Sequence, residues 1–381
     1  MDLLETREPN LVQKQLKNSG EPLRLGIVGV GHLGKEHARI ASGLSGVKLV
    51  GVADPNRAQA EAVAAKCNCE GFENPSELMD LVDAVVVVTP TRFHHAVAME
   101  SLKRGLPTLV EKPITPTARE ARELEQAAEL AGVCLQVGHI ERFNPAYEAA
   151  RQTSLVPRYI RAERAGKFTG RSLDVGVVLD LMIHDLDLVL DWDPSEVVSV
   201  EAFGAAILGG HEDIAQARLR FQSGLIADIS SCRMSPIPAR QMVAMGSEGV
   251  VKIDFAGKKV ELIQPSQALA SGMIDATRMT PLALQALQQE MAGHLEQTDK
   301  TCESQHDQLT RELMDFAQAA RTGKSPRVTG TDGRRVVELA ERILEAMAAH
   351  RWTGRVDGPH GIKGLPAPRG PLVAEMRRAA A

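Results

Sequence analysis

Apolar runs alternate with helical segments over the first third of the chain, and this alternation constrains the fold more than any other feature. The runs are rich in β-branched residues and nearly continuous, which suits strands buried on both faces of a parallel sheet. They cover residues 23–30, 47–54, 84–90, 107–113 and 133–139. Segments with helical spacing lie between them, at 33–44, 57–66, 94–104 and 117–131. This order predicts right-handed βαβ units in a doubly wound α/β domain of the Rossmann type over residues 23–140.

The pattern changes after residue 140. Six apolar runs follow, most of them in direct succession, at 158–165, 197–207, 214–221, 224–233, 240–246 and 249–255. Such a meander predicts a mostly antiparallel, open sheet in a C-terminal α+β domain over residues 141–355. We expect helices at 145–152, 177–190, 309–321 and 331–350, and an insertion of helical or mobile character without strands at 264–308. Residues 1–22 and 356–381 are expected to be tails.

Composition excludes several classes of protein. The chain has 44 Lys and Arg against 49 Asp and Glu, a net charge of −5, and only 3% aromatic residues. A nucleic-acid partner would require an excess of cations, so none is expected. Cys67 and Cys69 form a C-x-C without a second pair at zinc spacing, so no metal site is expected. No apolar stretch is long enough to span a membrane, and residues 1–22 lack the apolar core of a signal peptide, so we expect a cytoplasmic protein.

A glycine-rich turn joins the first apolar run to the first helical segment. It reads Gly29-Val30-Gly31-His32-Leu33-Gly34, a G-x-G-x-x-G pattern directly after a strand. Gly29 permits the tight turn, Gly31 lets a ligand approach the backbone, and Gly34 allows close packing of helix on sheet. The N–H groups at the helix start, where His32 and Leu33 lie, suit a pyrophosphate. The turn therefore predicts a dinucleotide site.

The nature of the dinucleotide follows from the end of the second run. Asp54 lies 20 residues after Gly34, where such folds bind the adenosine ribose. A carboxylate there accepts hydrogen bonds from the ribose hydroxyls and repels a 2′-phosphate, which favours NAD over NADP. Arg57 lies close enough along the chain to accommodate such a phosphate, so NADP stays as the less favoured alternative.

Two later runs end in polar residues at the carboxyl edge of the predicted sheet, where open α/β sheets bind ligands. The third run ends in Thr89-Pro90, and His94 follows at the next helix start. We assign these residues to the edge of the cofactor site, with a helix cap as the alternative role for His94. The fourth run ends in Glu111 and Lys112. A lysine at that edge would point its ammonium group into the crevice where a nicotinamide ring lies.

The helical segment 177–190 carries an unusual set of polar residues between apolar flanks. Asp180 and His184 stand at i and i+4, so on a helix they share one face. Burial of a carboxylate together with an imidazole requires pairing or a polar cleft. We expect a structural bond from Asp185, and positions towards the solvated side for Asp187 and Asp191.

These motifs together resemble the glucose–fructose oxidoreductase / inositol dehydrogenase / rhizopine-catabolism (Gfo/Idh/MocA) family. The resemblance covers residues 23–355 and rests on GIVGVGHLGKEHA (26–38), ADPN (53–56), TPTRFHHAVA (89–98), EKPI (111–114), GHIERFNP (138–145), D-x-x-x-H (180–184) and VTGTDGRRVVELAERI (328–343). It implies that Lys112, Asp180 and His184 surround a sugar hydroxyl that an NAD(P)-dependent oxidoreductase oxidises. His184 would act as the general base, Lys112 would stabilise alkoxide character, and Asp180 would orient the substrate or tune the base.

Two segments resemble the nucleotide-sugar branch of the family, GHIERFNPA (138–146) and DVGVVLDLMIHDLDLVL (174–190). Its members oxidise the 3-hydroxyl of UDP-N-acetylglucosamine, or of the corresponding uronate, before an aminotransferase acts in lipid A or surface-polysaccharide synthesis. A UDP group needs cationic and hydrogen-bonding partners, which we expect from Arg142, Asn144, Arg164, Lys167, Arg171 and Ser172.

Other functions stay open at this point. One alternative is an inositol or free-sugar dehydrogenase, or an NAD-using glycosidase, of the same fold. Another is a non-catalytic regulator that senses a dinucleotide, although it would not need the three residues Lys112, Asp180 and His184. The open sheet of the second domain is expected to leave one face without helices, which predicts a homodimer or homotetramer.

Overall fold

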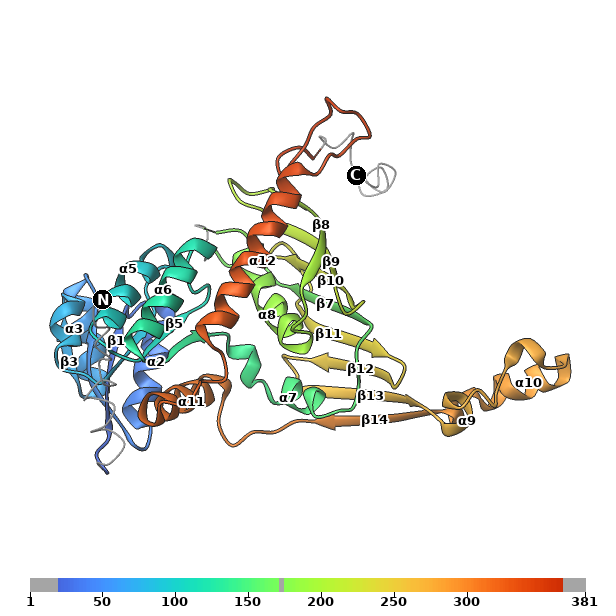
Figure 1. The fold of residues 1–381 in the computed structure, drawn as a ribbon, viewed down its shortest axis with the longest axis horizontal. Coiled ribbons are helices and arrows are strands. Elements are labelled where there is room, and N and C mark those ends of the chain that lie inside the picture. The colour runs from blue at the N-terminus through green and yellow to red at the C-terminus, as the bar shows by residue number, and fades with distance from the viewer. Residues whose placement is uncertain (1–19, 171–174, 366–381) are drawn as a thin grey trace, which may run out of the picture.

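A computed structural model describes residues 20–170 and 175–365 of the chain, and its elements form two sheets in two domains (Figure 1). The first sheet has six parallel strands in the order β3-β2-β1-β4-β5-β6, as a Rossmann domain requires. Its strands are β1 (Leu23–Val28), β2 (Val47–Ala53), β3 (Glu70–Phe72), β4 (Ala84–Val87), β5 (Thr108–Glu111) and β6 (Leu135–Gly138). The predicted doubly wound parallel sheet is confirmed. The short strand β3 is an addition that three residues of sequence could not indicate.

Five helices cover this sheet on its two faces. They are α2 (His32–Gly43), α3 (Arg57–Cys67), α4 (Pro75–Met79), α5 (His94–Lys103) and α6 (Ala118–Ala131). Several begin at a residue whose side chain accepts a backbone N–H of the first turn, including Asn56, Asn74 and Thr117. The α2 helix instead begins at Gly31, without such a cap among the described residues.

The second sheet has eight strands in the order β14-β13-β12-β11-β7-β10-β9-β8. They are β7 (Tyr159–Ala165), β8 (Val197–Ala205), β9 (Ile214–Phe221), β10 (Ile226–Cys232), β11 (Ala239–Gly246), β12 (Gly249–Asp254), β13 (Lys259–Pro265) and β14 (Leu295–Thr301). All neighbours are antiparallel except β7 and β10, so the predicted mostly antiparallel sheet is confirmed. The expectation of no strand within 264–308 is wrong for β14. Its sequence is polar and all of its residues are exposed, because it is an edge strand held by pairing with β13.

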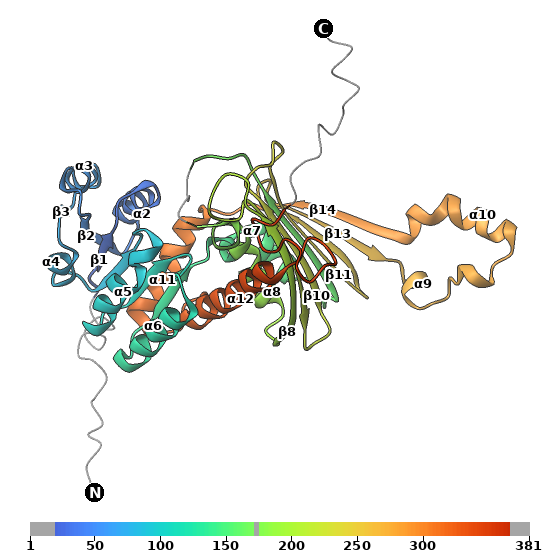
Figure 2. The same ribbon diagram turned by 90° about the horizontal axis from the view of Figure 1, so that it is seen from above.

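Helices cover only one face of the second sheet. Figure 2 shows α7 (Pro145–Arg151), α8 (Ile183–Trp192) and α12 (Gly330–Ala349) on the side that faces the Rossmann domain. Along β9, buried and exposed residues alternate strictly, as expected when one face is covered and the other is not. On the uncovered face, Arg218 pairs with Asp228 at 2.7 Å. None of the described helices combines the length and apolar character that a membrane span requires.

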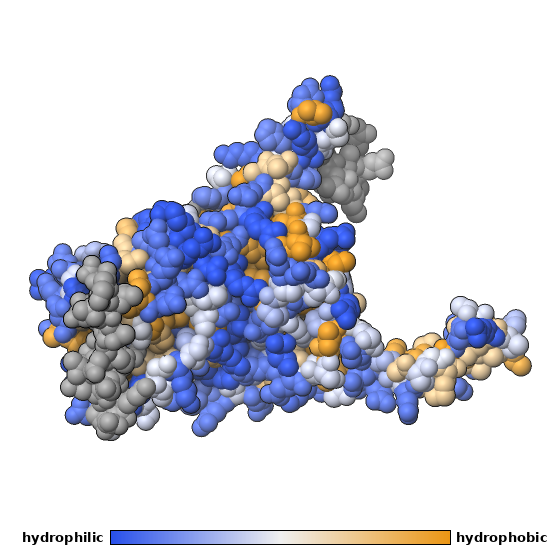
Figure 3. All heavy atoms as spheres, viewed as in Figure 1, coloured by the Kyte–Doolittle hydropathy of each residue, from blue (hydrophilic) through white to orange (hydrophobic). Residues whose placement is uncertain are grey.

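The segment between β13 and β14 extends away from both domains as an arm (Figures 1 and 2). It contains α9 (Gln267–Ala270) and α10 (Pro281–Glu290), so its predicted helical character is confirmed. Residues of mixed hydropathy cover its surface in Figure 3, and Leu282 and Met273 are largely exposed.

After the arm, the chain returns to the Rossmann domain before it re-enters the second domain. The helix α11 (Gln308–Thr322) lies within the range predicted for the C-terminal domain, yet its Leu313 and Phe316 belong to the same core cluster as Leu25 of β1. The helix α12 then packs against both α6 and α8. One face of α11 thus completes the Rossmann core, and this placement brings Glu312 beside the end of β5.

Candidate functional site

The glycine-rich turn has the geometry of a dinucleotide cradle. Gly29 has φ 91°, and a Cβ there would lie 2.6 Å from the Val88 carbonyl oxygen, so only glycine fits. A Cβ on Gly34 would lie 2.0 Å from the Gly29 oxygen, which keeps helix and strand close. No described atom lies within 4 Å of a Cβ built on Gly31, so that side of the turn is open. The first N–H groups of α2, beginning at His32 and Leu33, therefore suit the phosphates of a dinucleotide.

Asp54 lies directly beside this turn at the end of β2. Its carboxylate accepts the Val30 N–H at 3.0 Å and the Asn56 N–H at 2.9 Å. Arg57 pairs with Glu61 at 2.8 Å on the surface of α3. Asp54, which would repel a 2′-phosphate, is thus fixed at the site. Arg57, which would attract such a phosphate, is already paired with Glu61. This arrangement fits NAD.

His94 connects the ends of β4 and β5. Its Nε2 lies 2.7 Å from the Thr89 carbonyl oxygen and its Nδ1 lies 2.8 Å from the Pro113 carbonyl oxygen. The ring is 1% exposed, and burial lowers the pKa of His94. The prediction that His94 contacts the cofactor conflicts with this placement, because both ring nitrogens face backbone of the protein. Thr89 and Pro90 lie at the predicted edge and are more exposed.

The three predicted catalytic residues lie between the two domains. The Lys112 Nζ at the end of β5 donates to the Asp180 carbonyl oxygen at 2.7 Å and to its Oδ1 at 3.2 Å. Asp180 lies in the π-helical turn η3 (Val178–Met182), which precedes α8. The predicted helix over 177–190 is confirmed, although residues 178–182 form a π-helical turn within it. A π-turn is frequent at functional sites, and here the backbone oxygen of Asp180 accepts a hydrogen bond from the Lys112 Nζ.

The surroundings of His184 favour its neutral form. Burial lowers the pKa of His184 well below its ordinary value, and the nearby charges of Lys112 and Arg164 act in the same direction. Its Nδ1 is buried without a hydrogen-bond partner in the described part of the chain. A neutral imidazole beside an ammonium group can accept a proton from a substrate hydroxyl, as general-base catalysis requires.

Two arginines expected to bind substrate instead form a buried arginine network with carboxylates. Arg142 donates to both oxygens of Asp187, at 2.7 and 2.9 Å. Arg164 donates to both oxygens of Asp185, at 3.1 and 2.9 Å, and to Glu141 at 2.9 Å. Because both guanidinium groups are buried and paired, the prediction that they bind a substrate anion conflicts with the structure. The arginine network comprises Glu141, Arg142, Arg164, Asp185, Asp187 and Asp191.

The expectations for the nearby acidic residues have mixed outcomes. Asp185 makes the expected structural bond, to Arg164. Asp187 is completely buried, so its predicted position towards solvent is wrong. Asp191 is partly exposed and pairs with Arg142, while its Oδ2 accepts the Tyr147 hydroxyl. The sequence shows the acidic residues of this helix but not the arginines that reach them from other elements.

The remaining predicted substrate residues differ in placement. Asn144 is completely buried, where it accepts the Ala146 N–H and donates to the Phe255 carbonyl oxygen. It caps α7, and its predicted contact with substrate conflicts with that role. Lys167 is exposed on the segment after β7. Arg171 and Ser172 lie outside the described residues.

Two residues near the site escaped the sequence analysis. Arg240 is exposed and pairs in register with Arg164 across β11 and β7, so both lie on the covered face of the sheet. Its charge contributes to the lowered pKa of His184, and no carboxylate of the described chain forms an ion pair with it. His139 follows β6, is 1% exposed, and has both ring nitrogens unpartnered among described residues. A single Arg or His at the edge of an apolar run does not indicate that its side chain will lie near the site.

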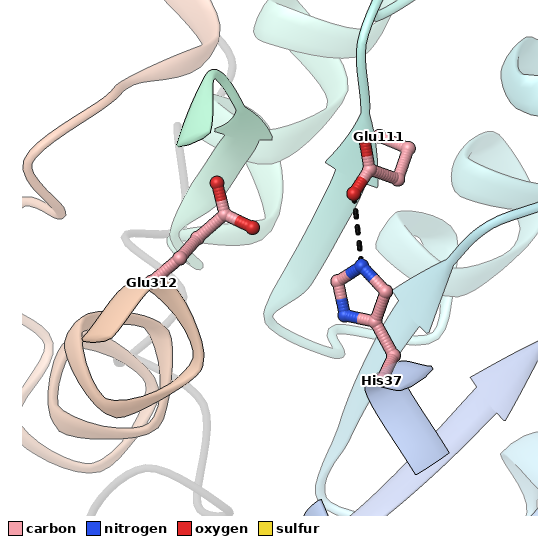
Figure 4. Close-up of side chains that lie close together, drawn as sticks. All are labelled: His37, Glu111 and Glu312. Atoms are coloured by element: carbon pink, nitrogen blue, oxygen red, sulfur yellow. Dashed lines mark hydrogen bonds and ion pairs between the residues drawn. The ribbon is translucent and has the colours of Figure 1, made fainter. Parts of the chain in front are cut away.

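Glu111 belongs to a second buried group on the far side of β5. Its Oε1 lies 2.8 Å from the His37 Nε2, and its Oε2 accepts the Lys112 N–H at 3.1 Å. Glu312 of α11 points towards this pair (Figure 4). Burial opposes ionisation of Glu111, but the hydrogen bonds and charges of His37 and Lys112 together outweigh it and lower the pKa of Glu111. The predicted contact of Glu111 with cofactor conflicts with this enclosure, and Glu111 instead positions Lys112.

Comparisons with known proteins agree with this geometry. Residues 23–139 match the model of the oxidoreductase family with an NAD-binding Rossmann fold, and residues 136–252 match the GFO/IDH/MocA C-terminal domain. A UDP-N-acetylglucosamine 3-dehydrogenase from Acidithiobacillus ferrooxidans is 34% identical over 328 residues, which cover 86% of this chain and 98% of that protein. A scyllo-inositol 2-dehydrogenase (NAD(+)) from Bacillus subtilis is 28% identical over 81% of this chain and 90% of its own length.

Solved structures give the same result. A crystal form of the Acidithiobacillus ferrooxidans enzyme superposes with a TM-score of 0.76 at 33% identity, over 85% of this chain and 97% of that one. Because the matching family is one of oxidoreductases and the relatives are dehydrogenases, the alternative of a non-catalytic regulator is excluded. The chain belongs to the Gfo/Idh/MocA family, and it is an NAD-dependent oxidoreductase that acts on CH–OH groups.

Proposed function

We propose that this enzyme oxidises a hydroxyl group, at C3, of a nucleotide sugar such as UDP-N-acetylglucosamine or its uronate. The observation that carries the proposal is the contact of Lys112 with Asp180 beside the neutral imidazole of His184. The similarity to a UDP-N-acetylglucosamine 3-dehydrogenase over 86% of the chain supports the choice of substrate.

The three side chains divide the reaction between them. The turn Gly29–Gly34 and Asp54 would hold NAD, which would supply the acceptor for the hydride of the sugar carbon. His184 takes the hydroxyl proton, so that the O–H and C–H bonds break and a C=O bond forms. Lys112 donates a hydrogen bond to the same oxygen and stabilises its developing negative charge. Asp180 holds the Lys112 ammonium group in place through two oxygens.

The pyrophosphate of a UDP-sugar needs cations that lack partners of their own. Arg240 and Lys167 meet this condition, because both are exposed and neither forms an ion pair within the described chain. They replace the paired residues Arg142 and Arg164 in the proposed substrate site. Arg240 is the stronger candidate, because its charge already acts on His184.

The 3-keto product is the substrate that an aminotransferase needs to install a 3-amino group. We therefore place the enzyme before an aminotransferase in the synthesis of lipid A or of surface polysaccharide. The location in the cytoplasm, and the assembly into a homodimer or homotetramer through the uncovered sheet face, stay predictions. A monomeric mass by light scattering at micromolar concentration would contradict the predicted assembly.

An inositol dehydrogenase is the second candidate function. It is favoured by the 28% identity to the scyllo-inositol 2-dehydrogenase over 81% of this chain. An inositol carries no phosphate, so Arg240 would have no role in its binding. The two functions therefore differ in what they require of this one residue.

The test is formation of NADH with UDP-N-acetylglucosamine, its uronate and myo-inositol in parallel, with a carbonyl trap to remove the keto product. We expect activity with a UDP-sugar, and Lys112→Met should reduce kcat about 10²- to 10⁴-fold, since it removes a group that contacts the reacting oxygen. Oxidation of inositol alone would contradict the proposed substrate. Full turnover in His184→Ala at neutral pH would contradict the assignment of the base.

Arg240→Gln sharpens the choice of substrate. We expect KM for the UDP-sugar to rise about 10-fold, which corresponds to ~1.4 kcal/mol, with little change in kcat. Arg161→Gln is the matched control, because Arg161 is an exposed arginine on the other face of β7. Equal effects of the two variants would remove Arg240 from the proposed site.

A further inference from the structure

Three ionisable side chains from distant parts of the chain meet inside the Rossmann domain. His37 comes from α2, Glu111 from the end of β5, and Glu312 from α11 (Figure 4). They are 0%, 6% and 0% exposed, and one nitrogen or oxygen from each lies within 4.8 Å of the others. We call these three residues the His–Glu–Glu cluster.

The cluster has more hydrogen-bonding atoms than partners. Both carboxylate oxygens of Glu312 and the Nδ1 of His37 are buried and, among the described residues, have no partner. Gln136 lies alongside, where its Nε2 donates to the Glu312 carbonyl oxygen at 3.2 Å while its Oε1 is also unpartnered. Native proteins rarely leave buried polar groups unpaired, so this concentration at one point requires an explanation.

We propose that the His–Glu–Glu cluster binds one divalent first-row transition metal ion, with Zn²⁺ as the best candidate. The His37 Nε2 and the Glu111 Oε1 form a hydrogen bond of 2.8 Å, and a separation of about 0.5 Å more would give them the spacing of two ligands on one tetrahedral ion. In a tetrahedral site, ligand bonds of about 2.0–2.2 Å place two ligand atoms ~3.3–3.6 Å apart. The Glu312 carboxylate, within 4.8 Å of the other two groups, would have to move towards them to complete the site.

Charge and ligand chemistry select this class of ion. As ligands, the two carboxylates would carry two negative charges, which one divalent cation neutralises. The imidazole ligand disfavours Ca²⁺ and Mg²⁺, which prefer oxygen, and the absence of a thiolate among the three ligands disfavours Cu⁺.

The ion would act as a structural link. Its ligands come from three elements, and α11 lies nearly 200 positions after β5 in the chain. Glu111 also accepts the N–H of Lys112, so the ion would fix the strand end that carries the catalytic lysine. Because the cluster is enclosed, this role does not depend on the identity of the sugar substrate.

The test measures metal content and thermal stability in the full chain, so failure would not affect the proposed sugar oxidation. The protein is stripped with EDTA, dialysed against Zn²⁺ or Mn²⁺, and analysed by elemental mass spectrometry. We expect about one Zn²⁺ per chain, a Tm that rises on Zn²⁺ addition, and at least a 100-fold loss of affinity in Glu312→Gln. His211→Gln is the matched control, because His211 is an exposed histidine away from the cluster and should bind zinc as the unaltered chain does.

Each result decides the matter. No zinc above the level of Glu312→Gln, together with no rise of Tm, would overturn the proposal, and Glu312 would then hold a proton instead. Loss of zinc in His211→Gln would also overturn it. If Glu312→Gln fails to fold, His37→Gln provides the same comparison, because it removes the nitrogen ligand and keeps both carboxylates.

Discussion

Two buried groups of ionisable residues flank Lys112, and they differ in how their charges are compensated. In the arginine network, each buried carboxylate of Asp185 and Asp187 accepts two hydrogen bonds from one guanidinium group. In the His–Glu–Glu cluster, the Glu312 carboxylate has no donor in the described chain. Bidentate arginine pairs are complete structural units, whereas an unpartnered buried carboxylate is able to take a ligand. Burial alone therefore does not distinguish structural charge from functional charge.

Removal of one cation from the arginine network should have the largest effect on stability. Arg164→Met leaves Asp185 and Glu141 buried without their guanidinium partner, and such a loss costs about 3–5 kcal/mol. The free energy of unfolding, measured by urea denaturation, should fall by this amount. Arg161→Met on the same strand should change it by less than ~0.5 kcal/mol, because Arg161 is exposed.

A second variant tests whether the cost comes from the stranded carboxylates. Arg164→Met combined with Glu141→Gln and Asp185→Asn removes the uncompensated negative charges as well. It should recover a large part of the lost stability, because neutral amides are less costly to bury than carboxylates. A loss below 1 kcal/mol in the single variant would show that the arginine network is not the complete unit described here.

His184 is a third buried ionisable residue near Lys112, and it should make the enzyme sensitive to acid. Its pKa in the folded chain lies well below that of the unfolded chain, which is near ~6.5. Between these two values the unfolded chain binds a proton that the folded chain does not, so stability falls as pH decreases below about 6.5. The loss approaches ~1.4 kcal/mol for each pH unit.

His184→Gln should flatten part of this acid limb in urea titrations at pH 5.5, 6.5 and 7.5. His94 and His139 also have lowered pKa values because of burial, so the remaining slope belongs to them. An unchanged slope in His184→Gln would mean that His184 is protonated in the folded enzyme. That result would also weaken its assignment as general base.

The comparison also shows what the sequence can and cannot predict. Apolar runs, glycine spacing and strand ends predicted the Rossmann sheet, the cradle at Gly29–Gly34 and the place of Lys112 at the carboxyl edge of that sheet, because these depend on local order along the chain. Arg142 and Arg164 were misassigned since a sequence shows a charge without its partner. The partners come from a helix that folds back over the sheet.

Glu312 and Arg240 are residues that the sequence analysis missed for the same reason. Glu312 reads as one polar position of an amphipathic helix, and only the return of α11 to the Rossmann domain brings it to Glu111. Arg240 reads as a solvated strand residue until the register with Arg164 places it near His184. In both cases long-range packing creates the site, and no spacing within one segment encodes it.

The smallest expected effect is a change in the free energy of unfolding that has opposite signs in the His–Glu–Glu cluster and in the arginine network. In the metal-free enzyme, at a pH above the raised pKa of Glu312, Glu312→Gln should raise the free energy of unfolding by about 1 kcal/mol, because a neutral amide is less costly than a carboxylate to bury without a partner. Glu141→Gln, the matched change in the arginine network, should lower it instead, because the Glu141 carboxylate receives a bond from Arg164. With saturating Zn²⁺, Glu312→Gln should become less stable than the unaltered chain, since only the carboxylate holds the ion. The effect of Glu141→Gln should not change. Parallel urea curves for both variants with and without Zn²⁺ would measure this, and destabilisation by Glu312→Gln in EDTA would show that Glu312 has a stabilising partner of its own.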